Sequence, residues 1–89
     1  MMYPYMTLED ETEVTHSPID ASGHVEVYFE KAVYGGFHDA TCILPEYKWK
    51  SVHGFNQDDI DGFTEYLKHN AHIILELAAE GGFEHATAV

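Results

Sequence analysis

The longest amphipathic pattern in the chain runs from Asn56 to Gly82 and predicts a single C-terminal helix. When successive residues are placed about 100° apart, apolar positions fall on one side of this helix and charged positions on the other. We therefore expect the helix to pack along a sheet and to turn its carboxylates to water. The apolar side contains Ile60, Phe63, Leu67, Ala71, Ile74, Leu75, Leu77 and Ala78, and the polar side contains Asp58, Asp61, Glu65, Lys68, His69, His72, Glu76 and Glu80.

Both ends of this segment carry residues that are typical of helix termini. Asn56 is a suitable N-cap, and Asp59 lies in the first turn, where the helix dipole favours negative charge. Gly81 and Gly82 provide the left-handed conformation that ends many helices. Asn70 falls inside the apolar arc, so we expect its amide at the rim of the core, hydrogen-bonded to a strand or loop carbonyl.

Residues 1–54 contain short runs of β-branched and aromatic residues separated by turn residues, a pattern that predicts strands. Short connections favour the pairing of sequential strands. The predicted fold class is therefore α+β, with an antiparallel meander of four or five strands packed against one long C-terminal amphipathic helix. The strands are expected at Tyr3–Leu8, Thr12–Ser17, His24–Lys31, Phe37–Leu44 and Tyr47–Val52.

A chain of 89 residues has room for one domain and one core. We divide it into a strand region (1–54), a helix (55–82) and a short tail (83–89). Cys42 is the only cysteine, which excludes an internal disulfide, and its apolar strand neighbours indicate a small core residue. The first residues show no signal-peptide pattern, and no apolar stretch is long enough to span a bilayer. We expect a cytoplasmic location and no membrane contact.

The charge balance is strongly acidic, with a formal net charge of −12 and four lysines as the only cations besides histidine. Such a surface repels phosphate, so we expect no direct nucleic-acid binding and a basic protein surface as the partner. The simpler alternative is that the acidity only keeps the protein soluble. Acids gather between the first two predicted strands and on the polar side of the helix. The candidate binding residues are Glu9, Asp10, Glu11, Asp58, Asp61 and Glu65.

A stripe of histidine and glutamate on the polar side of the helix is the candidate metal site. Glu65, His69, His72 and Glu76 are spaced by four, three and four positions, which places them along one line. Imidazole and carboxylate groups are ligands of Zn²⁺ and similar ions. The alternative is a solvated stripe in which Glu65 pairs with His69 and His72 pairs with Glu76. The HExxH spacing of zinc proteases is absent.

Other catalytic patterns fail on geometry. A calcium loop built around Gly62 would place Lys68 where a bidentate Glu is required. His38 and Cys42 would be about 13 Å apart on an extended strand, too far for a thiol–imidazole pair. Glycine-rich phosphate-binding motifs are absent from the chain. We therefore predict a protein that is not an enzyme and needs no cofactor.

Aromatic and cationic residues interleave at positions 47–50. The pattern favours an edge strand protected by its lysines, with Trp49 partly packed on the core. A protein-contact site formed by Tyr47 and Trp49 is the alternative. If Tyr28, Tyr34 and Trp49 are exposed together, they form an apolar patch through which a homo-oligomer would assemble.

These patterns favour a small interaction or regulatory protein of a bacterium or phage. It would engage a basic protein surface, as an antitoxin, an immunity protein or a nucleic-acid mimic does. The alternative function is a small metal-binding protein or metal-dependent enzyme that uses the histidine and glutamate stripe.

Overall fold

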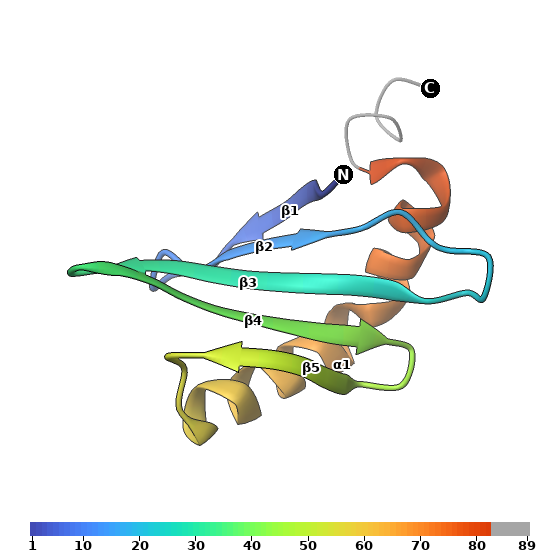
Figure 1. Ribbon diagram of the computed structural model, residues 1–89. Coiled ribbons are helices and arrows are strands. Elements are labelled where there is room, and N and C mark those ends of the chain that lie inside the picture. The colour runs from blue at the N-terminus through green and yellow to red at the C-terminus, as the bar shows by residue number, and fades with distance from the viewer. Residues whose placement is uncertain (83–89) are drawn as a thin grey trace.

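The computed structural model describes residues 1–82 and contains five strands followed by one helix. The strands pair in sequential order, and each runs antiparallel to its neighbours (Figure 1). The predicted α+β meander with one C-terminal helix is confirmed. The elements are β1 (Tyr3–Thr7), β2 (Glu13–His16), β3 (Val25–Val33), β4 (Gly36–Leu44), β5 (Lys48–His53) and α1 (Gln57–Glu80).

The core lies between α1 and one face of the sheet (Figure 1). At its centre the ring of Phe29 stacks on that of Phe63, with 4.4 Å between the ring centroids. Each large apolar side chain buried in this way contributes roughly 1.5–3 kcal/mol to stability. Of the eight apolar positions predicted for the helix, all but Leu75 are buried, and Leu75 packs at the edge of the core. The buried sheet residues include Val14, Val25, Val27, Phe29, Ala40, Cys42 and Leu44.

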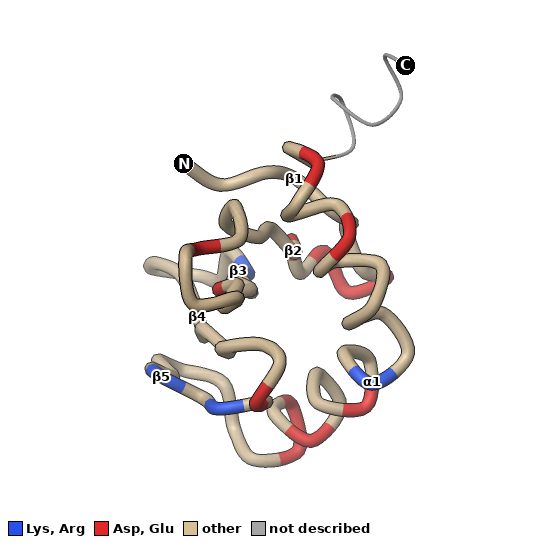
Figure 2. Tube along the Cα trace, turned by 90° about the vertical axis from the view of Figure 1, so that its right-hand side faces the viewer, with Lys and Arg blue, Asp and Glu red and all other residues tan. Residues whose placement is uncertain are grey.

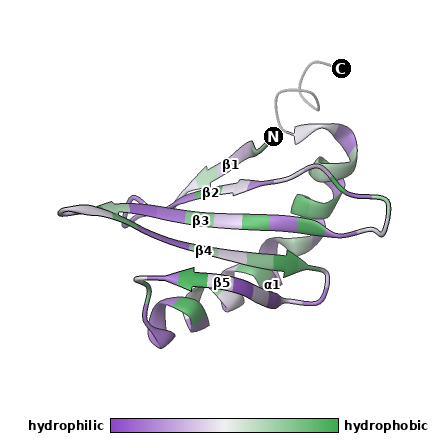
Figure 3. Cartoon of the chain, in the orientation of Figure 1, coloured by the Kyte–Doolittle hydropathy of each residue, from purple (hydrophilic) through white to green (hydrophobic). Residues whose placement is uncertain are grey.

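Alternating side chains divide the sheet into a buried face and an outer face. Along β3, Val25, Val27 and Phe29 are fully buried, and the residues between them are only half-buried. The hydropathy colours alternate accordingly along this strand (Figure 3). Within the described part of the chain no element covers the outer face (Figures 1 and 2), an arrangement that is common in antiparallel sheets.

The ends of α1 follow the predicted capping residues. The Asn56 side chain accepts a hydrogen bond from the backbone N–H of Asp59 (2.8 Å), and the Asp59 carboxylate accepts one from the backbone N–H of Asn56 (3.0 Å). This reciprocal pair is a capping box. At the other end Gly81 adopts a left-handed conformation and donates its backbone N–H to the carbonyl of Leu77.

The prediction that Asn70 bonds a strand or loop carbonyl is wrong. Its Oδ1 accepts a hydrogen bond from the Tyr5 hydroxyl (2.7 Å), and its Nδ2 donates to the carbonyl of Tyr66 in the preceding helical turn (2.8 Å). The acceptor of the Asn70 amide is therefore a carbonyl of α1 itself and not one of a strand or loop, and the hydroxyl of Tyr5 reaches from β1 to donate to the amide oxygen. The amide joins the edge strand to α1.

Tyr47 lies in the β4–β5 turn, so the expected strand from this residue begins one position later, at Lys48. Its backbone has a positive φ of 60°, which strand geometry does not allow. Trp49 packs on the core as predicted, with its ring centroid 5.7 Å from that of Phe29 and its Nε1 donating to the Thr64 hydroxyl (3.2 Å). Cys42 is fully buried, and burial raises the pKa of its thiol to about 11.

The predicted aromatic patch does not form. Tyr28 points to the outer face of the sheet, whereas Trp49 packs toward α1 and Tyr34 lies at the β3–β4 turn. The predicted tail, residues 83–89, lies outside the described residues. Across residues 1–82, no helix combines the length and the apolar composition that a membrane span requires.

Candidate functional site

The β1–β2 turn and the first turns of α1 face each other across a groove of about 440 Å³, which we call the acidic groove. Carboxylates from both segments border it, and apolar side chains also line it. The groove thus joins two acidic segments that are far apart in the sequence. Its lining residues are Leu8, Glu9, Asp10, Asp58, Asp59, Gly62, Phe63 and Tyr66.

Backbone hydrogen bonds fix the strand side of the groove. The backbone N–H of Leu8 donates to the carbonyl of Thr12 (2.8 Å), and the N–H of Glu11 donates to the carbonyl of Leu8 (3.0 Å). Inside this turn the Asp10 carboxylate accepts a hydrogen bond from the N–H of Thr12 (3.1 Å) and lies 3.5 Å from the Lys31 ammonium. Slight burial alone would raise the pKa of Asp10, but the contacts with Thr12 and Lys31 lower it overall. This carboxylate therefore holds the turn together.

The helix side of the groove is set by the start of α1. Asp59 is engaged in the capping box, whereas the neighbouring Asp58 is exposed. Gly62, one turn further along, has open space where a Cβ would be, so the groove is not filled at this point. Among residues 1–82, neither Asp58 nor Glu9 has a hydrogen-bond or ion-pair partner for its carboxylate. One unpaired carboxylate therefore stands on each side of the groove.

The apolar lining of the groove belongs to the core. Phe63 is almost fully buried, and its ring is held between those of Phe29 and Phe55. Tyr66 is half-buried, and its hydroxyl donates to the sulfur of Met6 (3.5 Å). Burial raises the pKa of the Tyr66 hydroxyl, with a smaller contribution from Tyr5, so the phenol stays neutral. The groove thus combines aromatic rings with carboxylates, and this combination fits the side chain of Lys or Arg. The alkyl stem of such a side chain can pack on the rings while its charged end meets the carboxylates.

The structure brings together half of the six acids predicted to bind. Glu9, Asp10 and Asp58 line the groove, and Glu11 lies in the same turn without lining it. The other two lie on the exposed side of α1, where Asp61 accepts a hydrogen bond from the Gln57 side chain (2.9 Å) and Glu65 pairs with Lys68 (3.1 Å). The lining residues missed by sequence reasoning are Leu8, Asp59, Gly62, Phe63 and Tyr66.

The four candidate metal ligands are all exposed on α1. Glu65 contacts Lys68 instead of the expected His69, and His72 does not reach ion-pair distance of Glu76. Considering residues 1–82 only, the structure contains no group of three or more His, Cys, Asp or Glu side chains placed to hold a metal ion. The metal site stays a prediction.

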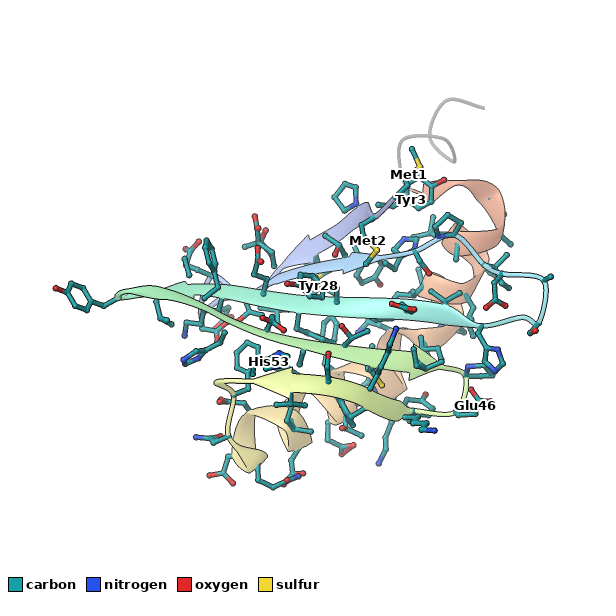
Figure 4. All side chains as sticks on the ribbon, viewed as in Figure 1. Met1, Met2, Tyr3, Tyr28, Glu46 and His53 are labelled. Carbon is teal, nitrogen blue, oxygen red and sulfur yellow. The ribbon has the colours of Figure 1, made fainter. Side chains whose placement is uncertain are left out.

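A larger pocket of about 870 Å³ lies beside the β4–β5 turn, where Figure 4 labels Glu46. Its acids are already paired: the His24 ring lies 2.8 Å from Glu46 and 4.0 Å from Asp20, and Lys50 lies 3.3 Å from Glu26. Hydrogen bonding to Glu46, together with the charges of Glu46 and Asp20, raises the pKa of His24. Trp49 also lines this pocket, and the expected contact role of Tyr47 and Trp49 stays a prediction.

Three carboxylates stand side by side across the outer face of the sheet. Glu13 of β2 is directly opposite Glu30 of β3, which is opposite Asp39 of β4, and we call this set the acidic row. The Asp39 carboxylate also lies 3.0 Å from the ring of His53 in β5 (Figure 4 labels His53). The Tyr28 hydroxyl donates to Glu30 (3.2 Å). Its pKa is raised by burial first and then by the charges of Asp39 and Glu30.

Comparison with known protein families, curated proteins and solved structures gives no match for this chain. The function is therefore inferred from the arrangement of its own residues.

Proposed function

We propose that this protein is a non-enzymatic interaction protein that binds a basic protein surface, and that the acidic groove receives an Arg or Lys side chain of the partner. The observation that carries the proposal is the pair of unpaired carboxylates, Glu9 and Asp58, facing one groove whose apolar lining includes Phe63 and Tyr66. Two segments that are far apart in the sequence, the β1–β2 turn and the start of α1, supply these groups. A free, buried Cys42 also fits a reducing, cytoplasmic setting.

Charge gives this surface a long-range role as well as a local one. With a formal net charge of −12, the protein attracts a basic partner before contact and raises the rate of association. At ionic strengths above about 0.1 M the Debye length falls below about 10 Å, so this steering weakens with added salt. Glu9 and Asp58 are both exposed, so added salt should also weaken their direct contact with a cation.

The alternative that acidity only maintains solubility predicts a different response to mutation. If only total charge matters, any two carboxylates are equivalent. If the acidic groove is the binding site, removing Glu9 and Asp58 weakens binding more than removing two acids elsewhere. The distal part of α1 offers a matched pair, Glu76 and Glu80, which are both exposed and lie outside the groove.

The test is a calorimetric titration with an oligo-arginine peptide, with an oligo-serine peptide as the uncharged probe. We expect the Glu9→Gln/Asp58→Asn variant to bind the arginine peptide about fivefold more weakly, equivalent to about 1 kcal/mol. The Glu76→Gln/Glu80→Gln variant has the same net charge and should change the affinity by less than about twofold. Equal losses in both variants, or affinity that does not depend on salt, would contradict the proposal.

A further inference from the structure

The β3–β4 hairpin extends beyond the strands on either side of it (Figure 1). Pairing between β2 and β3 ends at Glu13 and Glu30, and pairing between β4 and β5 ends at Asp39 and His53. Residues 31–38, which we call the hairpin arm, therefore pair only with one another. The arm projects from the end of the sheet as a two-stranded extension.

The tip of the arm is apolar and exposed on an otherwise acidic protein. Val33 is paired with Gly36, so the turn consists of Tyr34 and Gly35, and Gly35 has a φ of +86° that favours glycine. Tyr34 is fully exposed and Phe37 is 63 % exposed. These two aromatic rings contribute little to the core. Exposed aromatic residues of this kind are typical of the centres of protein–protein contacts.

The base of the arm is braced by contacts on the helix side of the sheet. Lys31 lies 3.5 Å from Asp10 of the β1–β2 turn. The His38 ring meets the ring of Phe55 edge-on, with 5.4 Å between centroids, and packs so closely on Gly54 that a Cβ there would collide with it. These contacts hold the base of the arm in place on the domain, which lowers the entropy lost when the arm binds a partner.

Acids surround the base of the arm. Glu30 and Asp39 stand at its root on the outer face, and Asp10 stands beside Lys31 on the other. We propose that Tyr34 and Phe37 contact apolar side chains of a basic protein partner, while Glu30 and Asp39 face the Arg or Lys residues that border them. This inference rests on the proposed function and adds to it the kind of surface that fits: apolar residues flanked by basic ones.

Charge argues against two other occupants of the arm. Two copies of this chain each carry a formal net charge of −12 and therefore repel each other. An anionic membrane surface would likewise repel a protein with a net charge of −12. A basic partner is the occupant whose charge is complementary to the acids around the apolar tip.

The test uses two synthetic peptides of equal length and charge, one alternating Arg with Leu and the other alternating Arg with Ser. We expect the wild-type protein to bind the Arg–Leu peptide about tenfold more tightly. The Tyr34→Ser/Phe37→Ser variant should lose this preference but keep its affinity for the Arg–Ser peptide and the salt dependence of that affinity. An Ile19→Ser/Ile73→Ser variant, which changes two exposed apolar residues elsewhere, should retain the preference.

The other outcomes of this titration distinguish a failure of the proposed function from a failure of the arm proposal. If neither peptide binds, the proposed function fails. If both peptides bind equally, or the tip variant retains the preference, the arm proposal fails while the proposed function stands. Sedimentation of the wild-type and tip variants supplies a further check, because a wild-type dimer that the tip variant loses would assign the arm to a second copy and overturn the proposal. Binding of wild-type protein to neutral lipid vesicles, lost in the tip variant, would overturn it as well.

Discussion

Replacing Glu30 by Gln should stabilise the fold. Glu30 stands in the middle of the acidic row, with Glu13 on one side and Asp39 on the other. Directly opposite side chains in antiparallel strands have Cβ atoms about 4.5–5.5 Å apart, and like charges at this spacing repel each other. Gln is nearly isosteric, and its side-chain oxygen still accepts the hydrogen bond from Tyr28. The substitution therefore removes repulsion with little change in packing.

The expected gain in the free energy of unfolding follows from the number of like-charge contacts that the substitution removes. Cross-strand charge pairs contribute about 0.2–1 kcal/mol each, so two like-charge contacts correspond to about 0.4–2 kcal/mol. For a domain of this size, a gain of about 1 kcal/mol raises the Tm by about 4–8 °C. Added salt should reduce the gain, because at about 1 M ionic strength the Debye length of about 3 Å is shorter than the cross-strand spacing.

Urea denaturation of the wild-type and Glu30→Gln proteins at low and high salt measures this effect. The midpoint should rise at low salt with an unchanged m-value, and the difference should shrink at high salt. Glu76→Gln is the matched control, since it removes the same charge from an exposed position of α1 with no strand neighbour. If the Glu30→Gln protein is no more stable than the Glu76→Gln protein at low salt, repulsion within the acidic row does not destabilise the fold.

Two further predictions concern hydrogen bonds between distant segments. Tyr5→Phe removes the donor to Asn70 and should lower the free energy of unfolding by about 0.5–1.5 kcal/mol in urea denaturation; unchanged stability would show that this bond contributes nothing net. His24 has a raised pKa in the folded state because of Glu46, so its contribution to stability is fully present below about pH 6.5 and is lost as the pH rises through the folded-state pKa. The stability difference between wild type and His24→Gln should thus be larger at acidic than at alkaline pH, and a difference that does not depend on pH, or that grows toward alkaline pH, would contradict this assignment.

The sequence alone determined the secondary structure and its order. The helix was predictable because its apolar positions repeat with helical spacing and because Asn56 and Gly81 mark its ends within one or two residues. The strands were predictable because alternation and turn residues are local signals. Sequential pairing then followed from the short connections, which leave little freedom for any other order.

Only the tertiary structure decided which distant side chains meet. The acidic groove exists because the packing of α1 on the sheet brings the start of the helix next to the β1–β2 turn, and no local pattern encodes that packing. The partner of Asn70 was mistaken for the same reason, since the reach of Tyr5 across the edge of the sheet depends on packing. The hairpin arm likewise could not be predicted, because it depends on where the neighbouring strands β2 and β5 stop pairing with β3 and β4. Periodicity fixes which face of each element is buried, whereas the registers and angles between elements arise from side-chain packing across the whole core.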